Sequence, residues 1–92
     1  MSTITPVSFA VDGEHVAESL QSVRENLNTT TGEALLDFFF VQRLDPSGLT
    51  ALEELAGTAD VLNTKVILRG VNVEIYKVLK LAMLAERFSF VD

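Results

Sequence analysis

The sequence predicts a small α/β domain with about four mainly parallel strands and about three helices. Two kinds of apolar spacing alternate along the chain, one typical of strands and one typical of helices, and only a few residues connect consecutive segments. Strands that alternate with helices in this way form a mainly parallel sheet with right-handed crossovers. A chain of 92 residues has room for one core, so we assign residues 1–92 to a single domain.

The first strand and the first helix follow from a change in apolar spacing. Residues 4–11 carry apolar side chains at every second position, at Val7, Phe9 and Val11, which indicates a strand with one buried face. After a break at Asp12 and Gly13, the apolar residues recur at helical spacing. Residues 28–32, which favour turns, are expected to end this helix. Its apolar face comprises Val16, Leu20, Val23 and Leu27.

The middle of the chain predicts a buried strand followed by a helix. Residues 34–41 form an almost unbroken apolar run, which is typical of a central strand covered on both faces. A turn-forming segment at residues 45–48 then precedes apolar residues at helical spacing. These are Leu49, Leu52, Leu55, Ala56, Ala59 and Leu62.

The last third of the chain predicts two more strands, at residues 65–69 and 88–91, with a helix between them. Asn72 is expected to cap this helix. Val78, Leu81 and Leu84 widen its apolar stripe beyond that of an ordinary surface helix, so they are either buried against a neighbouring helix or exposed for a partner or self-association. The expected core face consists of Ile75, Tyr76, Leu79 and Met83.

Composition and charge argue against several classes of function. Thirteen acidic residues against seven basic ones give a net charge of −6, which repels nucleic-acid phosphates and anionic membranes and favours a basic partner. The absence of cysteine excludes disulfides, thiolate zinc sites and cysteine nucleophiles. No signal-peptide pattern occurs, and no apolar run approaches the roughly 20 residues that span a bilayer. We therefore expect a cytoplasmic protein without direct membrane insertion.

The residues offer little for catalysis or for cofactor binding. The single histidine, His15, lies near the start of the first expected helix, where an exposed or capping residue is the ordinary interpretation. Glycine-rich phosphate-binding motifs and the nucleophile elbow are absent. Glu53 and Glu54 are adjacent on a helix, which indicates a solvated face. We expect no enzyme activity, no catalytic or metal-binding residues and no cofactor.

Residues 44–49 form the one candidate site. They place the Ser47 hydroxyl at a helix N-terminus, beside a glycine, Gly48, that would leave the backbone open to an approaching anion. Serine is also a favoured N-cap, and proline is common at helix starts, so the same residues have an ordinary structural interpretation. Taken alone, the segment favours the structural interpretation.

The segment nevertheless resembles the signature of the STAS family, which includes bacterial anti-sigma factor antagonists. In that family a hydrophobic strand ends in Asp, and a motif such as Asp-Ser-Ser-Gly-Leu begins eight residues later. Asp37 and Asp45 have this spacing. Residues 65–72 look like the family's next strand and turn, and the resemblance covers roughly residues 7–91.

The resemblance implies a protein-binding switch. In the regulatory members a partner anti-sigma kinase phosphorylates the serine before the glycine, a phosphatase reverses this, and Ser47 occupies that position. The unmodified protein would bind its partner, and phosphorylation would weaken the binding. Pro46 departs from the motif, which has Ser or Thr there, and both chain ends are shorter than in the family. The implied partner-binding residues are Asp45, Pro46, Ser47, Gly48, Leu49 and Thr50.

A second STAS-type function stays open. Residues 70–81 look similar to the third-helix region of the small STAS subunit of bacterial phospholipid-transport ABC complexes, which is likewise short. That subunit carries Thr at the motif position, and the resemblance implies constitutive binding to an ABC ATPase. The serine in this chain favours the regulator, whereas the short ends favour the subunit.

Overall fold

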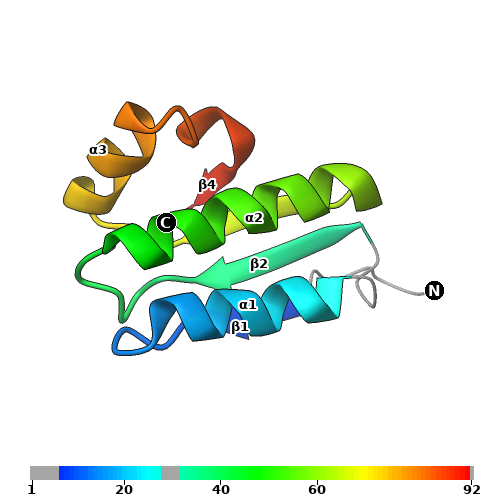
Figure 1. Ribbon diagram of the computed structural model, residues 1–92, viewed down its shortest axis with the longest axis horizontal. Helices are drawn as coiled ribbons and strands as arrows, with labels where there is room; N and C mark the ends of the chain where they lie inside the picture. Colours follow the sequence, from blue (N-terminus) through cyan, green and yellow to red (C-terminus); the bar gives the residue numbers. More distant parts are fainter. Residues whose placement is uncertain (1–6, 28–31, 92) are drawn as a thin grey trace.

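The computed structural model describes residues 7–27 and 32–91 and confirms the α/β class (Figure 1). Within these residues, four parallel strands form one sheet in the order β1-β2-β3-β4, and a helix connects each strand to the next. The strands are β1 (Val7–Ala10), β2 (Glu33–Asp37), β3 (Lys65–Arg69) and β4 (Ser89–Val91). The helices are α1 (Val16–Asn26), α2 (Pro46–Leu62) and α3 (Val73–Leu81), and a short 3-10 turn, η2 (Ala85–Arg87), precedes β4.

Most of the expected element positions are confirmed. β3 occupies the strand expected at residues 65–69, and β4 lies within residues 88–91. β1 forms the second half of the strand expected over residues 4–11. Residues 4–6 of that strand and residues 28–31 of the first expected turn lie outside the described residues.

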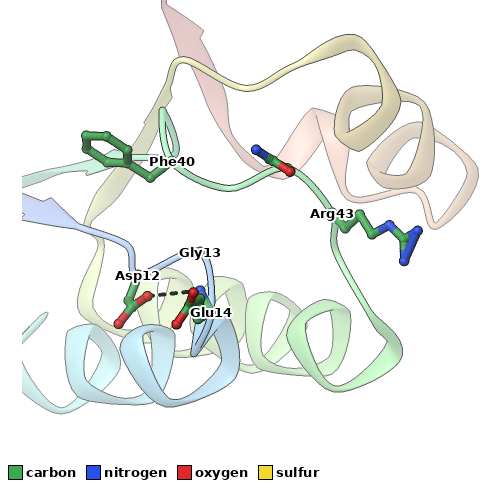
Figure 2. A pocket seen from close by; sticks show the side chains of 6 residues that line it. Asp12, Gly13, Glu14, Phe40 and Arg43 are labelled. Carbon is green, nitrogen blue, oxygen red and sulfur yellow. Dashed lines mark hydrogen bonds between the residues drawn. The ribbon is translucent and has the colours of Figure 1, made fainter.

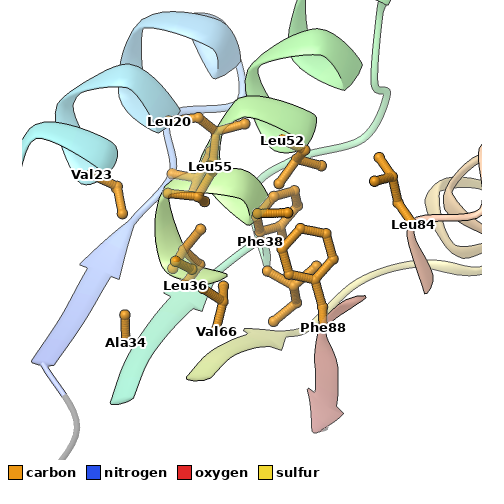
Figure 3. Close-up of a cluster of buried hydrophobic side chains, with 14 of the residues drawn as sticks. Leu20, Val23, Ala34, Leu36, Phe38, Leu52, Leu55, Val66, Leu84 and Phe88 are labelled. Atoms are coloured by element: carbon orange, nitrogen blue, oxygen red, sulfur yellow. The ribbon is translucent and has the colours of Figure 1, made fainter. Parts of the chain in front are cut away.

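The sequential strand order places the helices on one face of the sheet. Each right-handed crossover moves the chain one strand further in the same direction, so each connecting helix packs on the same side. Figures 1 and 3 show α1 and α2 side by side over this face. Among the described residues, therefore, no helix covers the opposite face.

The core lies between the helices and the covered face of the sheet. Leu36 of β2 and Leu68 of β3 are neighbours in register and point toward the helices. Figure 3 shows side chains of α1 and α2 pointing toward those of the strands. Burial of this apolar surface is the main favourable contribution to folding. The largest fully buried side chains are Phe38, Leu20, Leu27, Leu36, Leu52, Leu55, Leu68, Ile75, Leu79 and Val11.

The prediction of a strand over residues 34–41 is wrong about where the strand ends and about the burial of both its faces. β2 stops at Asp37, whose Oδ1 accepts a hydrogen bond of 2.9 Å from the Phe39 N–H and so begins a turn. Phe38 is buried, but Phe39 and Phe40 are 74% and 71% exposed. β2 also alternates between buried and half-buried side chains, so only one of its faces is fully covered.

The buried and exposed residues of the third helix differ from those that the sequence predicts. α3 ends at Leu81, so Met83 lies beyond it, with φ 60° and 82% of its surface exposed. Tyr76 is 41% exposed and packs edge-on against Phe90, with 5.1 Å between ring centroids. Met83 and Tyr76 are therefore not core residues. The buried residues of this region are Ile75, Leu79 and Leu84.

Substitution of Phe38 tests this division between buried and exposed aromatic residues. Phe38→Ala is expected to lower the free energy of unfolding by about 3–5 kcal/mol, because it removes a fully buried ring and leaves a cavity. The control Phe40→Ala removes the same atoms from an exposed position and is expected to change the free energy of unfolding by less than about 0.5 kcal/mol. Urea unfolding followed by circular dichroism measures both, and equal losses would contradict the division.

Candidate functional site

The candidate site lies at the carboxyl ends of the strands, where the connecting loops meet the start of α2. This edge is the usual position of functional sites in open parallel sheets. A Cβ atom at Gly13 would lie 2.1 Å from the Phe40 carbonyl oxygen, and one at Gly70, which has φ 74°, would lie 3.2 Å from the Phe39 Cα. The two glycines therefore allow their loops to hold the turn at residues 39–40 between them.

Helix α2 begins with a cap that includes the Ser47 hydroxyl. Asp45 is the N-cap, and its Oδ1 accepts a hydrogen bond of 2.8 Å from the Gly48 N–H. Ser47 Oγ donates to the same oxygen at 3.0 Å. The interpretation of Ser47 as the cap itself is therefore wrong. Pro46 lies in the first helical turn, where its missing N–H is not needed, and the Ser47 side chain is exposed to solvent.

The hydrogen bonds to Asp45 favour its ionised form. The Gly48 N–H has the largest effect and the Ser47 hydroxyl the next, and together they lower the pKa of Asp45 below its ordinary value of 3.8. The helix dipole of α2 acts in the same direction. The Ser47 hydroxyl therefore contacts a negative charge at neutral pH.

The Asp45 carboxylate already occupies the anion position that the sequence suggests at this helix start. Besides the Gly48 N–H, the Leu49 N–H donates to the Asp45 carbonyl oxygen at 2.9 Å, and Pro46 has no N–H. The Ser47 N–H alone among these groups has no partner within the described part of the chain. A further anion would have to compete with Asp45 for the other donors.

Gly48 allows close packing and does not give access to the backbone. It is buried, and a Cβ atom there would lie 3.0 Å from Leu44 Cδ1 and 3.2 Å from Val16 Cγ1. The expectation that this glycine leaves the backbone open to an approaching group is wrong, because the start of α2 packs here against α1.

The six residues expected to bind a partner divide into two groups. Gly48 is buried and Leu49 is half-buried against the core. Thr50 Oγ1 donates to the Pro46 carbonyl oxygen at 3.0 Å, so this hydroxyl is directed back along the helix. The exposed group, which a partner could contact directly, consists of Asp45, Pro46, Ser47 and Thr50.

Sequence reasoning misses two exposed phenylalanines at the same edge of the sheet. The Phe39 and Phe40 rings meet edge-to-face with 5.8 Å between centroids, and both project into solvent. Adjacent large apolar side chains this exposed are typical of protein-binding surfaces. Asp37, which accepts a hydrogen bond from the Phe39 N–H, is a signal for the turn that the local sequence contains. Gly13 and Gly70, whose loops hold the turn, are distant from it in the sequence.

A hollow of about 480 Å³ lies beside Phe40 (Figure 2). Figure 2 shows the Asp12 carboxylate bonded to the Glu14 N–H, at 2.9 Å, and Arg43 directed away from this pair. That N–H is the main cause of a lowered pKa for Asp12, and Asp12 in turn raises the pKa of His15, whose Nδ1 lies 3.3 Å from Asp12 Oδ2. The hollow therefore combines an aromatic ring with acidic groups. Its lining consists of Asp12, Gly13, Glu14, Phe40, Gln42 and Arg43.

Hydrogen bonds of the Asn72 side chain connect the start of α3 to the loop that leads to Asp45. Asn72 caps α3 as expected, and its Oδ1 accepts a hydrogen bond of 2.8 Å from the Ile75 N–H. Its Nδ2 donates to the carbonyl oxygens of Val41 at 3.4 Å and Gln42 at 3.1 Å. One side chain therefore fixes both the helix and the loop.

Comparisons with known proteins add no identification. Neither the protein-family models nor the curated proteins include a match to this chain. Across residues 7–27 and 32–91, no cluster of three or more acidic or histidine side chains is arranged to hold a metal ion. The helices of the same residues are too short or too polar to cross a membrane.

The pH dependence of stability tests the role of the Asp45 charge. Asp45→Asn keeps an acceptor for the cap but removes the charge. Because folding lowers the pKa of Asp45, the carboxylate stabilises the fold above pH 3.8 and loses this effect as the pH falls through the folded-state pKa. We expect the wild type to have a higher melting temperature than the variant at neutral pH, and we expect this difference to shrink as the pH falls below 3.8. A difference that stays constant with pH would contradict this role.

Asn72→Ala is expected to lower the free energy of unfolding by about 1–2 kcal/mol, because it removes the cap of α3 and the two bonds to the loop. The control Asn63→Gly acts at the end of α2, where φ is 55° and glycine is well tolerated. Chemical denaturation measures both variants. A loss for Asn63→Gly as large as that for Asn72→Ala would show that the cap has no special role.

Proposed function

We propose that this chain is a STAS-type protein-binding regulator whose partner binding is controlled by reversible phosphorylation of Ser47. The observation that carries the proposal is the exposed Ser47 hydroxyl at the start of α2, hydrogen-bonded to Asp45 at 3.0 Å. The resemblance to the STAS signature supports it, because both residues occupy motif positions. The proposed partners are an anti-sigma factor-like serine kinase and a phosphatase in a bacterial cytoplasm.

The chemistry needs only an accessible hydroxyl on this chain. The kinase would transfer the γ-phosphoryl group of ATP to Ser47 Oγ, with release of ADP and of the hydroxyl proton. The phosphatase would cleave the ester with water, which restores the hydroxyl and releases phosphate. In the unmodified protein the bond to Asp45 Oδ1 orients Ser47 Oγ on the surface.

Phosphorylation would turn an attraction at the start of α2 into a repulsion. The ester no longer has the hydroxyl hydrogen that Ser47 donates to Asp45. It adds a charge of about −1.5 to −2 next to a carboxylate that is already ionised. The dipole of α2 favours the phosphate locally, so the domain can remain folded while the exposed surface gains negative charge. Repulsion and steric blocking at the interface would then reduce partner binding.

The aromatic pair supplies the apolar part of the proposed interface. Phe39 and Phe40 lie at the same edge of the sheet as Ser47, because they belong to the segment that joins the end of β2 to the start of α2. Interfaces draw most of their affinity from a few large side chains, and their charged surroundings mainly determine specificity. The acidic hollow beside Phe40 favours a partner with basic groups.

Constitutive binding to an ABC ATPase is the competing proposal. The observation in its favour is the exposed apolar surface near the end of α3, where Leu81 and Met83 are 86% and 82% exposed. Such a surface binds a partner without any modification. This function requires no phosphate on Ser47, and the experiment below separates the two proposals.

The experiment is a pull-down from the native cells with the wild type, Ser47→Ala and Ser47→Asp as baits. We expect the wild type and Ser47→Ala to recover a kinase-like protein. Ser47→Asp should recover at least about tenfold less of this protein, because the added charge repels the partner. Ser22→Asp, which adds the same charge at an exposed position of α1, is the control and should bind like the wild type. Mass spectrometry of the endogenous protein should find phosphate on Ser47.

Two results would overturn the proposal. If all baits retain the same ABC ATPase and Ser47 is never modified, the chain is a constitutive subunit. If Ser22→Asp loses the partner as completely as Ser47→Asp does, the loss reflects net charge and not the position of the hydroxyl.

A further inference from the structure

The face of the sheet opposite the helices carries an ordered pattern of charged and apolar residues. Residues that are neighbours in register point to the same side, so the alternation along each strand defines this face. Among the described residues no helix covers it. Parallel sheets are usually buried on both faces, so an open one needs an explanation. The face comprises Ser8, Ala10, Glu33, Leu35, Asp37, Lys65, Ile67, Arg69, Ser89 and Val91.

The two central strands present opposite charges in matching rows. Glu33 of β2 is the register neighbour of Lys65 of β3, and at the other end Asp37 is the neighbour of Arg69. The row between them is apolar and pairs Leu35 with Ile67, both only half-buried. Lys65 and Arg69 are exposed, and neither forms an ion pair within the described part of the chain.

We propose that this face binds the same face of a second copy of the chain, about a two-fold axis parallel to the strands. Such an axis places β2 of one copy over β3 of the other, and β1 over β4. Glu33 then faces Lys65 of the second copy, and Asp37 faces Arg69, each pair occurring twice. Leu35 faces Ile67 in the apolar centre.

The other two-fold arrangement of the same faces is unfavourable. An axis in the sheet plane but perpendicular to the strands would place each strand antiparallel over its own copy. Glu33 would then face Asp37 of the second copy, and Lys65 would face Arg69. Like charges placed opposite each other destabilise an interface. The charge pattern therefore selects one of the two arrangements.

The size of the face indicates a weak and reversible dimer. Strand spacing and rise give a face of about 19 by 16 Å, on the order of 300 Å² per copy. Stable interfaces bury about 800 Å² per partner. The small residues at the margins, Ser8, Ala10 and Ser89, allow two twisted sheets to approach closely. We therefore expect a dissociation constant above about 10 μM.

Sedimentation velocity of the whole chain tests the association. Between roughly 10 μM and 1 mM, the wild type should shift from monomer toward dimer. Lys65→Glu, which faces Glu33 of the second copy in the proposed dimer, should weaken association at least about tenfold. The control Lys77→Glu makes the same charge change on the exposed side of α3 and should behave like the wild type. Adding Glu33→Lys to Lys65→Glu swaps the pair and should restore the dimer.

Cross-linking tests the orientation, and the natural absence of cysteine makes it simple. Ser8 and Ser89 lie in the same row on the two outer strands, so they face each other between copies only in the proposed arrangement. Ser8→Cys and Ser89→Cys, mixed as proteins of different mass, should be joined to each other by a bis-maleimide that reaches about 10 Å, the spacing of packed sheets.

Each of three results would overturn the proposal. A chain that stays monomeric at protein concentrations up to about 1 mM has no such interface. A dimer that Lys65→Glu leaves intact uses another surface. Cross-links between two Ser8→Cys chains, with none to Ser89→Cys, would show the perpendicular axis. Thermal melting of each variant confirms that it is folded.

Discussion

Helix α2 begins at a carboxylate that accepts two hydrogen bonds with different consequences. The bond from the Gly48 N–H determines where the helix starts, and the bond from Ser47 Oγ holds a hydroxyl on the surface. Both bonds lower the pKa of Asp45, so the same charge stabilises the helix and lies against the hydroxyl. Modification of Ser47 would therefore act directly on the start of the longest helix. In the proposed switch, phosphorylation of Ser47 would change the charge of the surface at this helix start without refolding the domain.

The strand order determines where the helices and the loops of the domain lie. Because each crossover moves in the same direction, the helices share one face, and the loops at the carboxyl ends of the strands lie along one edge. That edge carries both Ser47 and the exposed Phe39–Phe40 turn, while the sheet face behind it carries paired rows of opposite charge. The proposed partner-binding site and the proposed self-association face therefore lie on different surfaces of the domain, and neither proposal requires the other.

The sequence predicts well what depends on local pattern and poorly what depends on contacts between distant segments. The alternation of strands and helices, the cap at Asn72 and the strand Lys65–Arg69 follow from periodicity and capping rules. The exposure of Phe40 does not, because an apolar run predicts burial, and the loops of Gly13 and Gly70 that hold the turn are distant from it in the sequence. Sequence reasoning located the Ser47 hydroxyl at a helix start but misassigned the cap, because it did not resolve which oxygen accepts the Gly48 N–H.

The proposed switch is tested most directly with protein that carries phosphoserine at position 47, introduced during synthesis. Its affinity for the partner recovered from the native cells is compared with that of unmodified protein by calorimetry. We expect the phosphorylated chain to bind at least about tenfold more weakly, with an unchanged circular dichroism spectrum. Equal affinities of the two forms would show that phosphorylation of Ser47 does not control partner binding.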